Sequence, residues 1–336
     1  MKLTILSSGT WGTALAIILA KAGHEVTVQC YTEEELKMLS VDRIHKNLPG
    51  AIVPDEIEFT MDIHAAVKDA KIIICAAPSI FVRSTIARIK DDVKKEQIIV
   101  SVAKGIEEKT LYTMSEVIED ELTTGNPVVA LSGPTHAEEV ALSIPTLIVS
   151  ASKDPEAAKK VQELFSGTCI RTYTNSDIKG VEICGALKNI IALACGISDG
   201  LGYGDNSKAA IITRGLAEIS RLGLKMGCSL ETFSGLSGVG DLIVTCTSRH
   251  SRNYNCGHFI GEGIEPEEAI KKVGMVVEGI NAIRPALKLT EKYEVELPIT
   301  NGVNAVIFEK YKPDEVVKKL FERSLKSELQ YEKTIL

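Results

Sequence analysis

Short apolar runs rich in branched residues alternate with helical patterns over the first half of the chain. Runs of this length, bounded by Gly, Pro and polar residues, are typical of buried strands. They occupy residues 2–6, 24–30, 71–77, 97–103, 127–133 and 145–151. Between them lie helical patterns such as residues 80–93 and 110–122. This alternation predicts a mainly parallel sheet with helices on both faces, in which ligands bind beyond the carboxyl ends of the strands.

The pattern changes between residues 176 and 188, where the strand signal stops and long helical runs begin. These runs cover residues 181–201, 208–227, 266–273 and 314–329. At 336 residues the chain is long enough for two domains that each bury a core. We therefore predict an α/β domain over residues 1–180 and an all-α domain over residues 181–336, without a flexible linker.

The opening stretch, residues 3–28, is open to two interpretations. Residues 3–20 carry no charge, follow Lys2 and lead into Ala20-Lys21-Ala22, which has the features of a signal peptide with its cleavage site. Polar residues and glycines interrupt the apolar run halfway, however, and Gly23 ends the helical pattern. A strand, a turn, a helix and a second strand then fit within about thirty residues, the size of a βαβ unit. This punctuation favours the βαβ interpretation.

The turn after the first strand has the spacing of a dinucleotide-binding turn. In the pattern G-x-G-x-x-G the glycines allow a tight turn, bring the backbone close to a pyrophosphate and let the helix pack on the strand. The stretch Ser7-Ser8-Gly9-Thr10-Trp11-Gly12 keeps the second and third glycines, and Ser7 replaces the first. An ordinary glycine-containing turn is the alternative. The βαβ context favours a cofactor turn in a Rossmann-type domain.

The end of the second strand usually decides between NAD and NADP, because an acidic residue binds the ribose hydroxyls or an Arg binds the extra phosphate. No Arg lies at residues 29–33, where Tyr31 is the candidate contact. The acidic residues Glu33 to Glu35 follow, and they also fit the first turn of a helix capped by Thr32. The choice between NAD and NADP therefore stays open.

Composition narrows the classes of function. The formal net charge of −7 at pH 7 argues against general binding of nucleic acid, and nothing in the composition suggests insertion into a membrane. Eight cysteines lie mostly in apolar runs, with no CxxC pair and no His at metal-ligand spacing. This usage fits buried thiols in a reducing compartment, and it predicts neither a disulfide framework nor a bound metal.

Lys188 and Asn189 are the most informative polar residues of the second half. They stand in the run "ICGALKNIIALACGISDG", in which most other residues are apolar or small. A buried ammonium is costly, so such a lysine usually has a lowered pKa or a charged partner. A lysine with a lowered pKa can act as acid and base near neutral pH. The alternative is a lysine whose ammonium reaches solvent at the edge of its helix.

Two further stretches place polar residues directly after predicted strands. Lys104 follows the strand at 97–103, and Gly133, Pro134 and Thr135 follow the next one. Both stretches lie at the edge of the sheet where ligands bind. We therefore expect them to face a ligand.

A third stretch, "GLSGVGDLIVTCTSRHSRNYN", combines a buried acid with anion-binding groups. Asp241 lies in its apolar, glycine-rich part, and Thr245 follows. Arg252, between Ser251 and Asn253, offers charged and neutral donors that fit a phosphate oxyanion. An ordinary polar loop is the alternative for this trio.

Taken together, these stretches resemble the NAD(P)-dependent glycerol-3-phosphate dehydrogenases of the bacterial type. The resemblance runs along nearly the whole chain. It is carried by "GTWGTALA" (9–16), "NLPG" (47–50), "APS" (77–79), "AKGIE" (103–107), "SGPTHAEEV" (132–140), "ALKNIIALACGISDGLG" (186–202), "TRGLAEISRLG" (213–223), "GVGDLIVTCTSRHSRN" (238–253) and "VVEG" (276–279).

The resemblance implies that Lys188 transfers the proton to and from the substrate and that Asp241 holds Lys188 in place. It implies substrate contacts from Lys104, Gly133, Thr135, Lys188, Asn189, Asp241, Thr245, Ser251, Arg252 and Asn253. With the glycine turn and the second strand included, the predicted cofactor contacts are Ser8, Gly9, Thr10, Trp11, Gly12, Tyr31, Lys104, Ala137, Arg252, Val276 and Glu278.

The implied activity is reversible hydride transfer between NAD(P)H and dihydroxyacetone phosphate, giving sn-glycerol 3-phosphate for glycerophospholipid synthesis. The resemblance also implies a cytoplasmic homodimer. Two departures concern the cofactor: Ser7 replaces a glycine, and Tyr31 stands near the position of an Arg that the family commonly has. Two alternatives remain, a dehydrogenase of another small phosphorylated or carboxylated ketone and a nucleotide-sensing protein without turnover.

Overall fold

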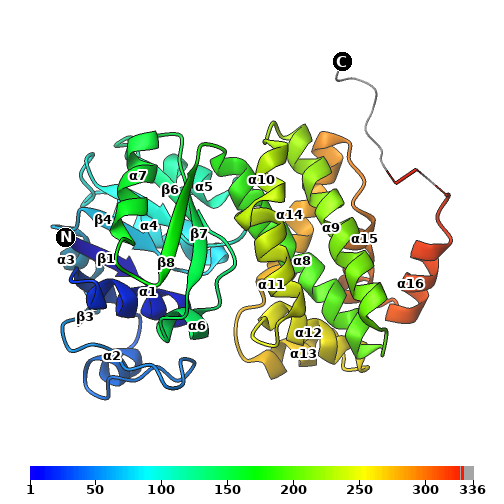
Figure 1. The fold of residues 1–336 in the computed structure, drawn as a ribbon, viewed down its shortest axis with the longest axis horizontal. Helices are drawn as coiled ribbons and strands as arrows, with labels where there is room; N and C mark the ends of the chain where they lie inside the picture. Colours follow the sequence, from blue (N-terminus) through cyan, green and yellow to red (C-terminus); the bar gives the residue numbers. More distant parts are fainter. Residues whose placement is uncertain (326, 329–336) are drawn as a thin grey trace.

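One eight-stranded sheet forms the N-terminal half of the described chain, which comprises residues 1–325, 327 and 328 of the computed structural model (Figure 1). The strands lie in the order β3-β2-β1-β4-β5-β6-β7-β8. Their bounds are β1 Lys2–Leu6, β2 Glu25–Gln29, β3 Glu58–Thr60, β4 Ile72–Cys75, β5 Ile98–Ser101, β6 Val128–Ser132, β7 Thr146–Ala151 and β8 Ile170–Asn175. All six predicted strands are confirmed.

The sheet is parallel except between β6 and β7, which pair antiparallel. The apolar runs in the sequence predicted neither β3 nor β8, the two strands at the edges of the sheet. β8 reads "IRTYTN" and exposes alternate residues, so it lacks the continuous apolar run that marks a strand buried on both faces. The prediction of a mainly parallel sheet is confirmed.

Helices cover both faces of this sheet because alternate residues of each strand face opposite sides. On β4, Ile72 and Ile74 join one buried cluster with α1 and α7, whereas Ile73 and Cys75 join another with α4 and α5. The helices of this half are α1 Thr10–Lys21, α2 Glu33–Ser40, α3 Ile63–Val67, α4 Val82–Ala87, α5 Met114–Glu121, α6 Ala137–Ala141 and α7 Pro155–Leu164. The strand, turn and helix predicted for the opening stretch are therefore confirmed.

Helices alone form the second half, which stands beside the sheet in Figure 1. The helix α8 begins three residues after β8 and lies at the centre of this half, in contact with α9, α11, α12, α14 and α15. The bounds are α8 Ile178–Gly200, α9 Asp205–Lys225, α10 Leu230–Ser234, α11 Asp241–Thr247, α12 Arg252–Gly261, α13 Pro266–Val273, α14 Glu278–Tyr293, α15 Pro298–Phe308 and α16 Pro313–Phe321. The predicted helical run 314–329 thus ends at Phe321, and its residues 326 and 329 lie outside the described chain.

The helix α8 is apolar on nearly all sides because other helices surround it. It is the one described helix that is long and apolar enough to cross a membrane, yet 94% of its most apolar window is buried inside the protein. Glycines let α12 approach it closely: a Cβ at Gly196 would lie 2.0 Å from the carbonyl oxygen of Tyr254. The mean hydropathy of α8 therefore reflects a core helix.

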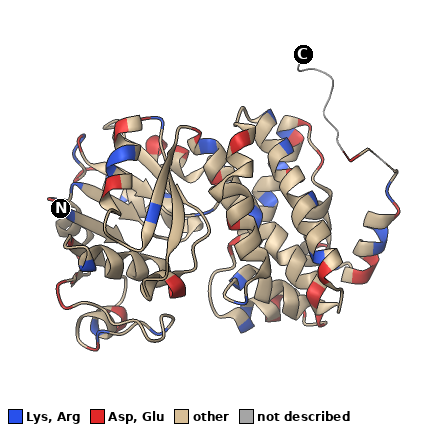
Figure 2. Cartoon of the chain, viewed as in Figure 1, with Lys and Arg blue, Asp and Glu red and all other residues tan. Residues whose placement is uncertain are grey.

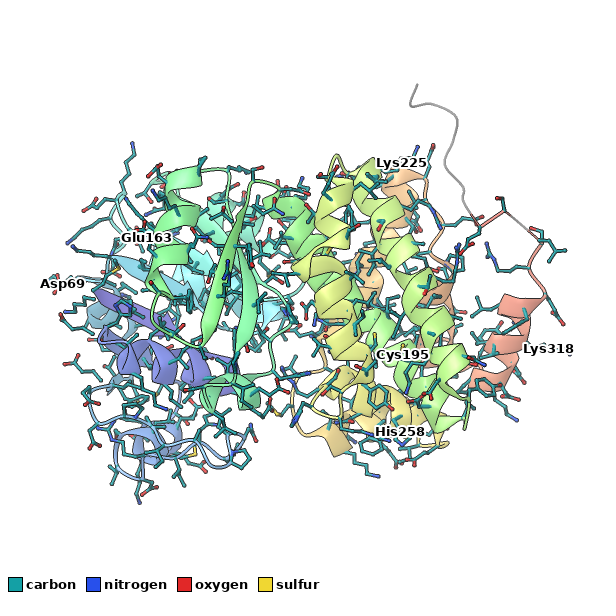
Figure 3. The ribbon with its side chains drawn as sticks, in the orientation of Figure 1. Asp69, Glu163, Cys195, Lys225, His258 and Lys318 are labelled. Carbon is teal, nitrogen blue, oxygen red and sulfur yellow. The ribbon has the colours of Figure 1, made fainter. Side chains whose placement is uncertain are left out.

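The charged side chains and the cysteines lie where the composition of the sequence leads one to expect them. Lys, Arg, Asp and Glu residues are interspersed over both halves of the molecule (Figure 2). The eight cysteines are free thiols, and Cys169 is the one that is only partly buried. Cys195, labelled in Figure 3, lies on α8 and is 0% exposed.

Candidate active site

A buried cluster of three charged side chains joins the two halves. Lys188 on α8 and Asp241 on α11 are 5% and 1% exposed, and Lys188 Nζ lies 2.7 Å from Asp241 Oδ1. Lys104, just beyond β5, places its Nζ 2.6 Å from Asp241 Oδ2 and donates a further hydrogen bond to the carbonyl oxygen of Gly133 at 3.1 Å. One carboxylate thus holds an ammonium from each half.

The surroundings of Lys188 give it a pKa suited to proton exchange. Burial and the nearby charge of Lys104 lower the pKa of its ammonium, the attraction of Asp241 raises it, and the net result is a pKa of about 8. Lys188 Nζ also donates to the hydroxyl of Thr245 at 2.5 Å, and that hydroxyl donates to the backbone carbonyl of Asp241 at 2.6 Å. The ammonium is therefore oriented by two acceptors, and Lys188 is only 5% exposed, which contradicts the alternative of a lysine at the solvent edge of its helix.

A cavity of about 660 Å³ opens between the two halves in front of this cluster. One wall consists of the glycine turn, the ends of β4 and β5, and residues 135–138. Helices α8 and α11, residues 250–253 and the segment before α14 supply the opposite wall. Lys188, Lys104 and Thr245 all line this cavity, so the lysines face a space large enough for a ligand.

The glycine turn has the geometry that a dinucleotide requires. A Cβ at Gly12 would lie 2.3 Å from the carbonyl oxygen of Ser7, so only glycine lets α1 pack this close to β1. A Cβ at Gly9 would meet nothing nearer than the Ser7 hydroxyl at 3.6 Å, which leaves its outer side open to the cavity. No side chain caps the N-terminus of α1. The free amides and the helix dipole there suit a pyrophosphate.

Ser7 has a backbone conformation that favours glycine. Its φ is +87°, in the left-handed region that costs a non-glycine residue free energy. The turn therefore carries backbone strain at Ser7, where the G-x-G-x-x-G pattern has its first glycine.

The anion-binding trio lies at the start of α12. Ser251 caps this helix by accepting a hydrogen bond from the Tyr254 amide at 3.2 Å, and Arg252 is the first, exposed residue of the helix. Asn253 donates to Asn189 Oδ1 at 3.0 Å and accepts from the Gly279 amide at 2.8 Å, which links α8, α12 and α14. All three residues line the cavity, so a helix N-terminus with a guanidinium faces it.

Two residues, Asn47 and Glu278, make contacts that bridge the halves beside the cavity. Asn47, on the loop after α2, donates to Thr10 Oγ1 at 3.3 Å and lies 3.6 Å from Met275 Sδ. Glu278 at the start of α14 accepts from the Ser79 amide at 3.0 Å and from the Ser79 hydroxyl at 2.5 Å. These contacts hold the segment before α14 against the N-terminal half.

Comparison with known proteins identifies the family. Residues 2–158 match the family model described as NAD-dependent glycerol-3-phosphate dehydrogenase N-terminus, and residues 177–318 match the corresponding C-terminus. The chain belongs to the NAD-dependent glycerol-3-phosphate dehydrogenase family. The resemblance and the fold class inferred from the sequence are confirmed.

Individual members of the glycerol-3-phosphate dehydrogenase family match over nearly the full chain. A protein of Lactobacillus delbrueckii subsp. bulgaricus named glycerol-3-phosphate dehydrogenase [NAD(P)+] 2 is 56% identical, over 98% of this chain and 99% of the relative. The Bacillus subtilis glycerol-3-phosphate dehydrogenase [NAD(P)+] is 47% identical, over 98% of this chain and 96% of the relative. The crystal structure of the Coxiella burnetii enzyme superimposes with a TM-score of 0.92 at 36% identity, over 96% and 99% of the two chains.

Most residues predicted for the glycerol-3-phosphate dehydrogenase site line the large cavity. Four do not. Asp241 lies behind Lys188, Gly133 offers its carbonyl oxygen to Lys104, and Gly12 packs against Ser7. Tyr31 lines a second cavity of about 330 Å³, together with Ser7, Pro78, Phe81, Ser84, Thr85 and Arg88. The roles of all these residues remain predictions.

Several residues at the cavity were not singled out from the sequence. His136 and His250 come from opposite halves, and their ring centroids are 5.4 Å apart; burial lowers the pKa of His136. Both histidines lie inside motifs that carried the resemblance, so these motifs could have identified them as site residues. His45 and Met275 had no such signal, because their loops show no periodic pattern.

Proposed function

We propose that this protein catalyses the reversible reduction of dihydroxyacetone phosphate to sn-glycerol 3-phosphate with NAD(P)H as the hydride donor. The observation that carries the proposal is Lys188, a buried ammonium with a pKa of about 8 held 2.7 Å from Asp241. It lines a cavity whose opposite wall includes the predicted dinucleotide-binding turn. The names of the relatives, all glycerol-3-phosphate dehydrogenases, support this substrate.

The nicotinamide cofactor supplies the hydride chemistry when bound. In reduction, C2 of the ketone accepts the hydride while Lys188 Nζ donates a proton to the C2 oxygen, so the carbonyl becomes an alcohol. Lys188 then regains a proton from solvent. In oxidation the neutral amine takes the proton of the alcohol. Asp241 and Thr245 act as positioning residues that keep Nζ directed at the cavity.

Arg252 and the N-terminus of α12 would hold the phosphate of the substrate. Lys104, which reaches Asp241 from the opposite wall, would contact both substrate and cofactor. An anchored phosphate fixes C2 beside Lys188, and positioning of this kind lowers the barrier by several kcal/mol. The remaining predicted contacts, from Thr135, Asn189 and Asn253, would complete the substrate pocket.

The proposal extends to a cytoplasmic homodimer that supplies glycerophospholipid synthesis. The free thiols of the described chain support a reducing compartment. Size-exclusion chromatography with light scattering tests the dimer, and a monomer at working concentration would contradict it.

The direct test is the loss of NADH or NADPH absorbance when the purified protein meets dihydroxyacetone phosphate, with chemical identification of the product. Stoichiometric formation of sn-glycerol 3-phosphate is expected. Reduction of another phosphorylated or carboxylated ketone, with dihydroxyacetone phosphate left untouched, would replace the substrate in this proposal. Cofactor binding without consumption by any such ketone would favour the sensor alternative.

A further inference from the structure

One acidic side chain on the cofactor side of the cavity has no part in the proton transfer. Glu35 lies in the first turn of α2, shortly after β2, and lines the cavity together with Ser8 and Trp11. Its Oε2 accepts a hydrogen bond from the Ser8 hydroxyl at 3.1 Å and another from the Tyr31 amide at 3.0 Å. The carboxylate is thereby fixed between the glycine turn and the end of β2.

The start of α2 adds to the negative charge at this place. Thr32 caps the helix by accepting from the Glu35 amide at 3.1 Å, as the alternative interpretation of this stretch expected. This cap uses the backbone amide of Glu35, so the carboxylate of Glu35 can accept the hydrogen bond from Ser8. Glu33 and Glu34 complete an acidic first turn, and Glu34 also lines the cavity.

Two cations lie near enough to be considered. Lys46, on the loop after α2, lines the same cavity. Arg88 lines the second cavity, where its guanidinium lies 5.8 Å from the centroid of the Tyr31 ring. Among the described residues, the contacts of the Glu35 carboxylate are with the Ser8 hydroxyl and the Tyr31 amide, and neither cation makes an ion pair with it.

In a Rossmann-type domain the ribose next to adenine binds at the end of the second strand. A fixed carboxylate there accepts hydrogen bonds from the ribose hydroxyls of NAD. In NADP a phosphate with about two negative charges replaces the 2′-hydroxyl donor, and it would meet this carboxylate. We propose that Glu35 makes this protein select NADH over NADPH, an inference that rests on the proposed function for the class of cofactor.

The test is a titration of the intact protein with NADH and, separately, NADPH, followed through quenching of Trp11, the only tryptophan. We expect NADH to bind at least about tenfold more tightly, equivalent to about 1.4 kcal/mol. Glu35→Gln should reduce this ratio by about tenfold, mainly through tighter binding of NADPH. Glu33→Gln is the matched control, because it removes the same charge from the same helical turn at a position that does not line the cavity, and it should keep the ratio. Thermal unfolding of each variant checks that it is folded.

Three results would overturn the inference. The first is equal or tighter binding of NADPH by the wild type, and the second is a wild-type ratio in Glu35→Gln. The third is a loss of NADPH binding alone in Arg88→Gln or Lys46→Gln, which would place the 2′-phosphate on a cation. The titration needs no ketone, so it is read independently of turnover with dihydroxyacetone phosphate. Quenching by neither cofactor would contradict both the inference and the proposed function.

Discussion

The two walls of the cavity are built from different parts of the chain. The N-terminal wall offers backbone groups, namely the amides at the uncapped start of α1 and the open side of Gly9. On the C-terminal wall side chains dominate, with Lys188 5% exposed and Asp241 1% exposed. Backbone amides attract an anion at any pH, whereas a buried amine gains or loses its proton near neutral pH. We infer that cofactor binding and proton transfer are divided between the two walls.

The largest expected effect is on turnover, from a change at Lys188 on the C-terminal wall. Lys188→Met removes the proposed proton donor, so turnover of dihydroxyacetone phosphate should fall by about 10³-fold. NADH should still quench Trp11 with nearly wild-type affinity, because the glycine turn is untouched. Lys208→Met, which breaks an ion pair with Asp199 outside the cavity, is the matched control and should keep turnover. Equal loss of cofactor binding in Lys188→Met would contradict the division of roles.

Asp241→Asn should be the most destabilising change. It leaves the ammoniums of Lys188 and Lys104 without their shared carboxylate, and removal of one partner from a buried ion pair costs about 3 kcal/mol of unfolding free energy. Because Asp241 raises the pKa of Lys188, this pKa should also fall further below 8. Urea unfolding measures the first effect. Asp205→Asn, whose carboxylate lies at the surface 3.9 Å from Lys208, should change stability little.

Two alanine substitutions test the role of the glycine turn in the N-terminal wall. A Cβ at Gly12 would meet the Ser7 carbonyl at 2.3 Å, so Gly12→Ala should cost about 2 kcal/mol of stability. The Cβ of Gly9→Ala has room in the protein, but Gly9 lines the cavity where the pyrophosphate is predicted to bind. That variant should fold normally and lose NADH affinity. If Gly9→Ala binds NADH as the wild type does, the turn is not the cofactor site.

The smallest effect concerns the strain at Ser7. Since its φ is +87°, Ser7→Gly should relieve strain that exceeds the extra entropy of glycine in the unfolded chain, a net gain of up to about 1 kcal/mol. Ser8 has no positive φ, so Ser8→Gly should destabilise the protein instead. The denaturant midpoints of the two variants should move in opposite directions. If both move in the same direction, relief of strain at Ser7 does not explain the change in stability of Ser7→Gly.

The sequence predicted what depends on local pattern. Strands buried on both faces stand out as apolar runs, and Lys188 stands out because a charge inside such a run is costly. The edge strands β3 and β8 escaped detection because a half-exposed strand has no continuous apolar run. Partners far apart in sequence escaped as well: Lys104 and Asp241 are separated by 137 positions, and only the packing of the two halves shows that they share a contact. The direction of the Glu35 carboxylate likewise depends on Ser8, 27 residues away.

The central claim, that Lys188 exchanges the proton, is tested most directly by the pH dependence of kcat/KM in both directions. Reduction needs the charged amine, so its rate should fall as pH rises through about 8, the pKa of Lys188. Oxidation of sn-glycerol 3-phosphate needs the neutral amine, so its rate should rise over the same interval. Mirror-image profiles are the result that the account predicts. Profiles with the same slope in both directions near pH 8, or a reduction rate that stays constant through it, would contradict the role of Lys188.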